Sequence, residues 1–191
     1  MKLLLLITLL LGSFSLMANP YQSQDESYQQ VLKTGKEVSM QLLQTLGKNM
    51  KKNMKAGGPV QAFNFCATEA YPLTDGVNSQ LDSGVSVKRI SLKYRNPANA
   101  PQKEEVAILK ALESLKANKA ILPPFIVQRV SKDTYKYYKP LSIHKGICLK
   151  CHGDISNKKV AQLIKTNYPN DLATGYKMHD LRGAIVVTIK K

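Results

Sequence analysis

Apolar residues recur at helical spacing early in the chain and predict two successive helices there. Gly57-Gly58 separates the two helices, and Pro59 suits the first turn of the second one. Small and apolar residues share one face of the second helix before Pro72 interrupts it. The stripe of the first helix consists of Val31, Val38, Leu42, Leu46 and Met50, and the face of the second of Phe63, Cys66, Ala67 and Ala70.

The second half of the chain mixes strand patterns with helical ones. Residues 85–94 alternate apolar and polar side chains, which predicts a strand. One helix is expected to end near Ala117 and a short one to cover 160–164. Further strands are expected as a hairpin at 125–131 and 135–140, and at 184–189. Helices first, then strands mixed with helices, predict an α+β fold with an antiparallel sheet rather than an alternating βαβ fold.

The first residues carry the pattern of a secretory signal peptide. Met1-Lys2 is followed by an apolar run and by small residues up to Ala18. The alternative is an uncleaved membrane anchor, but the run 3–17 is shorter than the ~20 residues of a membrane span. We expect the mature protein in the periplasm, without stable membrane insertion. The expected parts are a signal peptide at 1–18, a flexible leader at 19–27 and a single domain at 28–191.

The domain at 28–191 is predicted to be a c-type haem domain, because Cys148-Leu149-Lys150-Cys151-His152 reads C-x-x-C-H, the attachment signature of a c-type haem. Two thiols at this spacing can add to the two vinyl groups of one porphyrin, and the histidine then binds the iron as proximal ligand. The alternatives are a Cys148–Cys151 disulfide or half of a zinc site. Structural zinc needs four ligands, and the chain has no second cysteine pair. We therefore expect one covalently bound haem c per chain.

Cys66 is the third cysteine, and it has no disulfide partner once Cys148 and Cys151 hold haem. An unpaired thiol in an oxidising compartment is expected to be buried, paired with another chain or bound to a metal. Its small neighbours on the helix suit a surface that lies against a porphyrin, so Cys66 is a candidate distal ligand of the iron. The rivals are His144, His179 and several methionines. We expect both histidines to be exposed and the methionines of the first helix to be core.

The charge of the chain bears on its partners. Lys and Arg number 28 against 13 Asp and Glu, which gives a formal net charge of +15. Such a field favours an acidic redox partner or an anionic membrane surface. Nucleic acid is not expected as a partner because an exported protein rarely meets it. The lysines are spread along the chain, which indicates a solvated basic surface.

A set of motifs covers most of the chain in one order. They are Cys66, Arg95-Asn96-Pro97-x-Asn99-x-Pro101, Glu104 or Glu105, Tyr138-Lys139-Pro140, Cys148-Leu149-x-Cys151-His152-Gly153, Tyr168-Pro169-x-Asp171-x-Ala173-x-Gly175-Tyr176 and Asp180-Leu181-Arg182-Gly183-Ala184. With these motifs the chain resembles the exported single-haem proteins of the Tll-type haem domain family. That resemblance implies a PAS-like antiparallel sheet with N-terminal helices, His152 as proximal ligand and Cys66 as distal ligand. One departure is Met178-His179, where a glycine is expected just before Asp180.

Haem propionates are anionic and need donors from the protein. Arg89, Arg95 and Arg182 are candidates for this contact. Arg95, which opens the loop 95–101, is our first choice. Its alternative roles are turn stabilisation and plain surface exposure.

These features predict an exported c-type haem protein with His/Cys-ligated iron that acts in electron transfer or in redox or gas sensing. The PAS-like fold suggests sensing by analogy alone. The alternative is a small haem enzyme, a peroxidase or an oxide reductase, with a displaceable distal ligand. An enzyme needs an acid or base beside the iron, and the three histidines leave no convincing one because one of them is proximal. We therefore expect a carrier or sensor rather than an enzyme, and we assign no catalytic residue.

Overall fold

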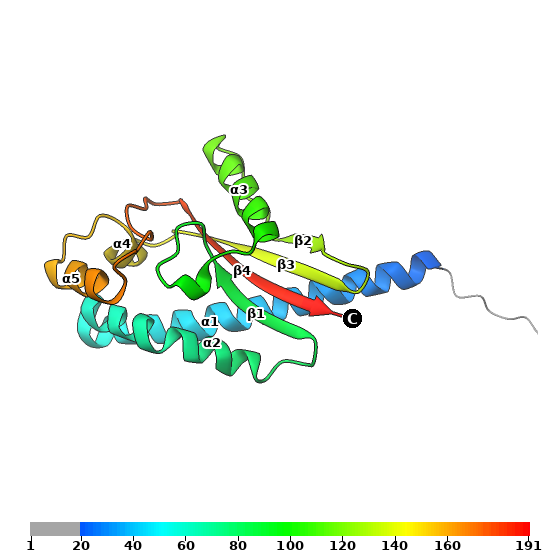
Figure 1. Ribbon diagram of the computed structural model, residues 1–191, viewed down its shortest axis with the longest axis horizontal. Coiled ribbons are helices and arrows are strands. Elements are labelled where there is room, and N and C mark those ends of the chain that lie inside the picture. The colour runs from blue at the N-terminus through cyan, green and yellow to red at the C-terminus, as the bar shows by residue number, and fades with distance from the viewer. Residues whose placement is uncertain (1–19) are drawn as a thin grey trace, which may run out of the picture.

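The computed structural model describes residues 20–191 and confirms the α+β prediction. Four antiparallel strands form one sheet in the order β1-β4-β3-β2, and helices cover it (Figure 1). The predicted signal peptide, 1–18, lies outside the described residues. Helix α1 (Pro20–Thr68) begins within the segment 19–27 that we expected to be a flexible leader. None of the described helices is long and apolar enough to cross a membrane.

Helix α1 is two helical segments joined by a kink, as predicted at Gly57-Gly58. Both glycines leave helical geometry, and Gly58 has φ 65°, a left-handed conformation that glycine adopts without strain. Pro59 then begins the second segment, because its fixed φ suits a first helical turn. The prediction that Pro72 ends this helix is wrong. The break lies one turn earlier, and Pro72 falls in the first turn of α2 (Ala70–Asn78), where a proline costs no hydrogen bond.

The strands follow the predicted segments closely. Strands β2 (Ile126–Arg129) and β3 (Thr134–Ser142) form the predicted hairpin, and β4 (Leu181–Lys190) is the predicted last strand. Strand β1 (Val85–Ile90) is shorter than the predicted 85–94. It stops because the next backbone N–H, that of Ser91, donates to the Asn99 carbonyl in the short helix η1 (Pro97–Asn99) instead of continuing the sheet.

The sheet is covered on both faces, and this explains the apolar run of β4. On one face, α1 packs Val31 and Leu42 against Tyr137 and Val187. Gly35 lets the helix approach closely, since a Cβ there would lie 2.3 Å from the Tyr137 ring. On the other face, helix α3 (Lys103–Ala117) packs over Tyr138 and Val186, among others. Strand β4 is therefore central and buried on both sides.

Helix α3 is held to the sheet by buried charges as well as apolar contacts. Glu105 is fully buried and accepts hydrogen bonds from Lys88 and Lys136 at 2.9 and 2.8 Å. Lys136 also donates to Gln102 and Glu104. Because the charges are paired in this way, the buried carboxylate does not carry the cost of an isolated ion.

The candidate site lies at one end of the molecule, where two short helices sit above the last part of α1 (Figure 1). Helix α4 (Gly146–His152) contains the whole C-x-x-C-H motif. Helix α5 (Lys158–Asn167) extends the predicted 160–164 by a few residues. The sequence pattern did not predict α4, because its 7 residues, about two helical turns, are too few to show a periodicity.

Candidate functional site

One cavity brings together the three cysteines, His152 and the first-choice propionate contact, Arg95. Its volume is about 200 Å³, and it lies between α4 and the second segment of α1. Most of its wall is apolar, and Ala62, Phe63 and Ile147 contribute to it. The predicted site residues in its wall are Cys66, Arg95, Cys148, Cys151 and His152.

Helix α4 sets the two motif thiols against two different parts of the protein. The apolar cluster around Cys148 contains Ala173 and Tyr176, and the one around Cys151 contains Phe63. Cys151 Sγ also lies 4.0 Å from the carbonyl oxygen of residue 59, at the start of the second α1 segment. All three cysteines of the described chain are free of disulfide bonds. The motif helix therefore bridges α1 and the C-terminal loop, with its thiols at the cavity.

His152 is oriented by a hydrogen bond to the loop before β4. Its Nδ1 lies 2.8 Å from the carbonyl oxygen of Ala173. A carbonyl can only accept, so Nδ1 carries the proton and Nε2 keeps its lone pair. Burial, together with the nearby Arg182 and Arg95, holds the pKa of His152 well below its usual range. The ring is therefore neutral at neutral pH, which is the form that binds a metal ion.

The loop that orients His152 is tied to the motif by backbone hydrogen bonds. The N–H of Tyr176 donates to the His152 carbonyl at 2.9 Å, and the N–H of Gly175 donates to the Gly153 carbonyl at 3.1 Å. The Tyr176 ring meets the His152 ring edge to face, with 6.3 Å between the ring centres. These contacts fix both the end of α4 and the plane of the imidazole.

Cys66 lines the same cavity from α1 and keeps exposed surface. The surrounding protein atoms, with a smaller contribution from Cys151, raise the pKa of its thiol to about 11, although Arg89 and Arg95 act in the opposite direction. The thiol is therefore protonated at neutral pH in the protein alone. A cation bound next to the sulfur would be needed to hold it as thiolate.

The Arg95 side chain binds the loop that carries Ala173. Its Nε and one terminal nitrogen bind Asp171 at 3.0 and 3.1 Å, and both side chains are nearly buried. The same terminal nitrogen donates to the Cys151 carbonyl at 2.8 Å. Arg95 thus joins η1, α4 and the 171–173 loop, and its geometry is that of a positioning residue.

Replacing Arg95 with methionine should lower the free energy of unfolding by about 3–5 kcal/mol, because Asp171 is then left as a buried, unpaired charge. Urea unfolding followed by circular dichroism measures this loss. The control Lys110→Met removes one positive charge from an exposed position of α3 and should change the stability by less than about 0.5 kcal/mol. Equal stabilities for the two variants would show that the Asp171 pair contributes nothing.

Arg89 and Arg182 lie with His152 in a second depression. Arg182 is occupied, since one terminal nitrogen donates to the Ser91 hydroxyl at 2.7 Å and to a backbone carbonyl at 3.0 Å. Arg89 is different, because its buried Nε has no hydrogen-bond partner among the described residues. Such a group is rare in a folded protein, and it leaves a buried N–H free to donate a hydrogen bond to a bound group.

The structure places the methionines of the first helix differently from the sequence prediction. Met50 and Met54 were expected in the core, but the structure has them half-buried in the wall of the cavity that holds Cys66. Their thioethers are therefore additional sulfur donors in the wall of this cavity, which the apolar pattern did not reveal. His144 and His179 are exposed, as expected, and line a different cavity. Neither histidine lies in the wall of the Cys66 cavity.

Comparisons with known proteins identify the family of this chain. The Tll0287-like family model, described as Tll0287, matches residues 22–190. A search of curated proteins finds no match. Among solved structures, the crystal structure of the cyanobacterial heme-protein Tll0287 matches with 26% identity and a TM-score of 0.59, covering 91% of this chain and 98% of that chain. This chain belongs to the Tll0287-like family.

Proposed function

We propose that this protein is an exported haem protein that works in electron transfer or redox sensing, with one haem c on Cys148 and Cys151. The observation that carries the proposal is the single cavity shared by these two thiols, His152 and Cys66. A solved relative that covers most of the chain is named a heme-protein. The signal-peptide pattern at 1–18 supports export to the periplasm, where such haem is attached.

The donors in the cavity suit haem better than a metal ion bound by the protein alone. Among the described residues no group of three or more His, Cys, Asp and Glu side chains is arranged to hold an ion. Cys66 and His152 would provide two protein ligands, which is the number that an iron already held by a porphyrin can take. When bound, haem would supply a centre that takes up and releases one electron.

His152 is the proximal ligand in this proposal because its free Nε2 is the only ring nitrogen left for a metal. The Ala173 carbonyl keeps Nδ1 protonated and raises the basicity of the opposite nitrogen. Arg95 holds the loop that carries this carbonyl, through Asp171. The protein thereby fixes the ligand's tautomer and its angle before any ion binds.

Arg89 is a better propionate partner than Arg95, our first choice from the sequence. The Arg95 guanidinium already binds a carboxylate and two backbone carbonyls. Arg89 has a buried Nε that is still free and lies beside His152. An anionic oxygen at this position would satisfy the orphan donor with a charge-assisted hydrogen bond.

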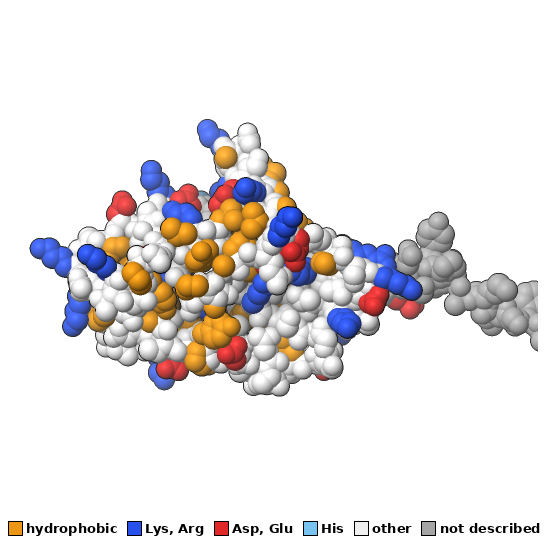
Figure 2. All heavy atoms as spheres, viewed as in Figure 1, with side chains coloured by type: hydrophobic (Ala, Val, Ile, Leu, Met, Phe, Trp, Pro, Cys, Tyr) orange, Lys and Arg blue, Asp and Glu red, His pale blue; other side chains and the backbone are white. Residues whose placement is uncertain are grey.

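The cavity favours a carrier or sensor over an enzyme. Its wall contains no carboxylate, and its one imidazole is the proposed proximal ligand, so no acid or base stands on the distal side. Positively charged side chains are scattered over the face seen in Figure 2 and do not gather into one patch. A partner with an acidic surface would therefore meet a general positive field, which speeds encounter more than it selects an orientation.

The proposal predicts that ligand access depends on the redox state. With haem bound, the Cys66 thiolate would favour the oxidised, more positive centre. Burial raises the pKa of this thiol to about 11 in the protein alone, which would favour its protonated, weakly binding form once the centre is reduced. Reduced protein should bind carbon monoxide within seconds, whereas oxidised protein should resist cyanide. Stopped-flow spectroscopy in both states measures this difference. Equally fast binding in both states would mean an open site and would support the enzyme alternative.

A further inference from the structure

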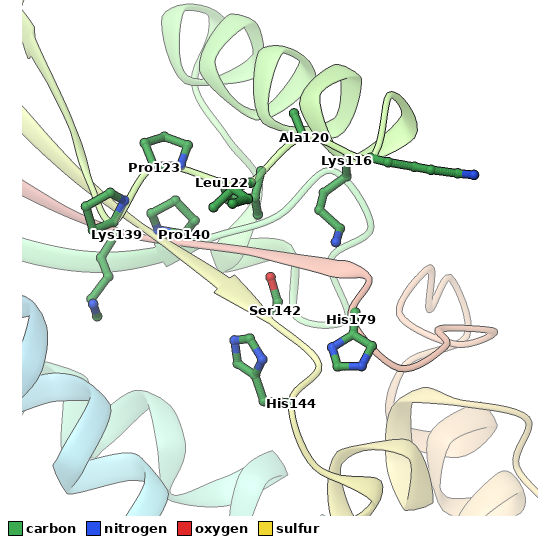
Figure 3. Close-up of a pocket in the computed structure, with 12 residues that line it drawn as sticks. Lys116, Ala120, Leu122, Pro123, Lys139, Pro140, Ser142, His144 and His179 are labelled. Carbon is green, nitrogen blue, oxygen red and sulfur yellow. The ribbon is translucent and has the colours of Figure 1, made fainter.

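The cavity lined by His144 and His179 has a volume of about 460 Å³ and lies between the end of α3 and the ends of β3 and β4. Figure 3 shows Ser142, His144 and His179 on its lower side, with their polar atoms near the hollow, and Lys116 reaching toward His179 from α3. Leu122, Pro123 and Pro140 form the upper, apolar side. The cavity thus has a polar end and an apolar end, and its volume lies within the range of small-molecule sites.

The charged groups in the wall of this cavity all have the same sign. The wall includes Lys116, Lys119 and Lys139 together with both histidines, and it includes no acidic residue. None of these five side chains forms an ion pair or hydrogen bond with another described residue. The carboxylates Asp180 and Glu113 line a neighbouring depression, which shares Lys116 with this cavity. A concave surface with several unpaired cations attracts an anion and repels a metal ion.

The backbone at this cavity is unusual. In the described chain, only two residues other than glycine have positive φ, namely Lys119 at 58° and His179 at 71°. Both line this cavity. Position 179 is also where a glycine was expected from the sequence motif, and the observed φ explains why glycine would suit it. A histidine in this strained conformation is consistent with a role for its side chain, because such strain collects at functional positions.

We propose that this cavity binds a small organic acid, a carboxylate with an apolar body. Its anionic group would accept hydrogen bonds from His144, His179 and the Ser142 hydroxyl, and it would lie beside the Lys116 ammonium. Each imidazole can donate one N–H even when it is neutral, so binding needs no protonation step. The apolar body would pack against Leu122 and Pro123. Inorganic phosphate lacks such a body and would use only the polar end.

Isothermal titration of the full-length mature holoprotein with hexanoate, and separately with inorganic phosphate, tests this proposal. Hexanoate should bind at one site, and phosphate at least about tenfold more weakly. His179→Gly relieves the strained backbone, so the protein should remain folded with an unchanged or higher melting temperature. It should nevertheless bind hexanoate about tenfold more weakly, as expected for the loss of one hydrogen bond to a charged group.

Two further variants test the role of positive charge at the cavity. Lys116→Gln should weaken hexanoate binding by a similar factor, whereas Lys165→Gln, an exposed lysine of α5, removes the same charge elsewhere and should leave binding unchanged. The proposal is overturned if wild-type protein binds no hexanoate at millimolar concentration, or if all three variants bind it equally well. Phosphate binding as tight as hexanoate binding would overturn the assignment to an organic acid.

Discussion

The double variant Cys148→Ala, Cys151→Ala should lose all covalently held haem, because it removes both thiols of the C-x-x-C-H motif. Each thiol supplies one thioether bond to the porphyrin, and nothing else in the cavity wall can form such a bond except Cys66. Cys66 lies on α1 and in our proposal binds the iron, on the face of the haem opposite His152, so it would not form a thioether. Haem staining of denaturing gels after co-expression with a c-haem maturation system measures the loss.

Single variants and a matched control sharpen this test. Cys148→Ala and Cys151→Ala should each retain one thioether and a weaker stain, because the two thiols act at different vinyl groups. Cys66→Ala removes the third thiol and should leave the stain at the wild-type level. The idea of covalent haem fails if the wild-type protein is colourless, or if the double variant stains as strongly as the wild type.

Local sequence patterns were enough to predict the main elements of this fold. Gly57-Gly58 and Pro59 mark the α1 kink because backbone geometry at these residue types is fixed by their own chemistry. The hairpin and the last strand were found for the same reason, since alternation and apolar runs are properties of neighbouring residues. The error at Pro72 arose because the same residue ends one helix or begins another, depending on where the preceding turn stops.

The parts of the site that the sequence did not reveal depend on contacts between distant segments. Arg95 and Asp171 are 76 positions apart, and their ion pair forms only when η1 meets the loop before β4. The partner of His152 is a backbone carbonyl, that of Ala173, and a carbonyl has no residue signature at all. Met50 fits an apolar helix stripe equally well whether it faces the core or a cavity. No one-dimensional pattern can separate those two cases.

Cys66→Ala should convert the oxidised protein from a low-spin thiolate species to a different coordination. The expected replacement ligands are the Met50 and Met54 thioethers, which line the same cavity. His179 and Met178 are exposed, and neither lies in the wall of this cavity. Thioether is neutral and favours reduced iron, so the potential should rise by on the order of 0.1–0.3 V, within the span of about 0.8 V that axial ligands cover. Paramagnetic resonance and potentiometric titration measure both changes.

A triple variant separates loss of Cys66 from capture of the iron by methionine. Cys66→Ala with Met50→Leu and Met54→Leu keeps the cavity's volume nearly constant, since Leu and Met are close in size. It leaves no donor on the distal side, so the oxidised protein should become high-spin and bind cyanide quickly. Cys66→Ala alone should still resist cyanide if a methionine has moved in. A low-spin thiolate signal that persists in Cys66→Ala would exclude Cys66 as the ligand, because no other thiol in the chain is free once Cys148 and Cys151 hold haem.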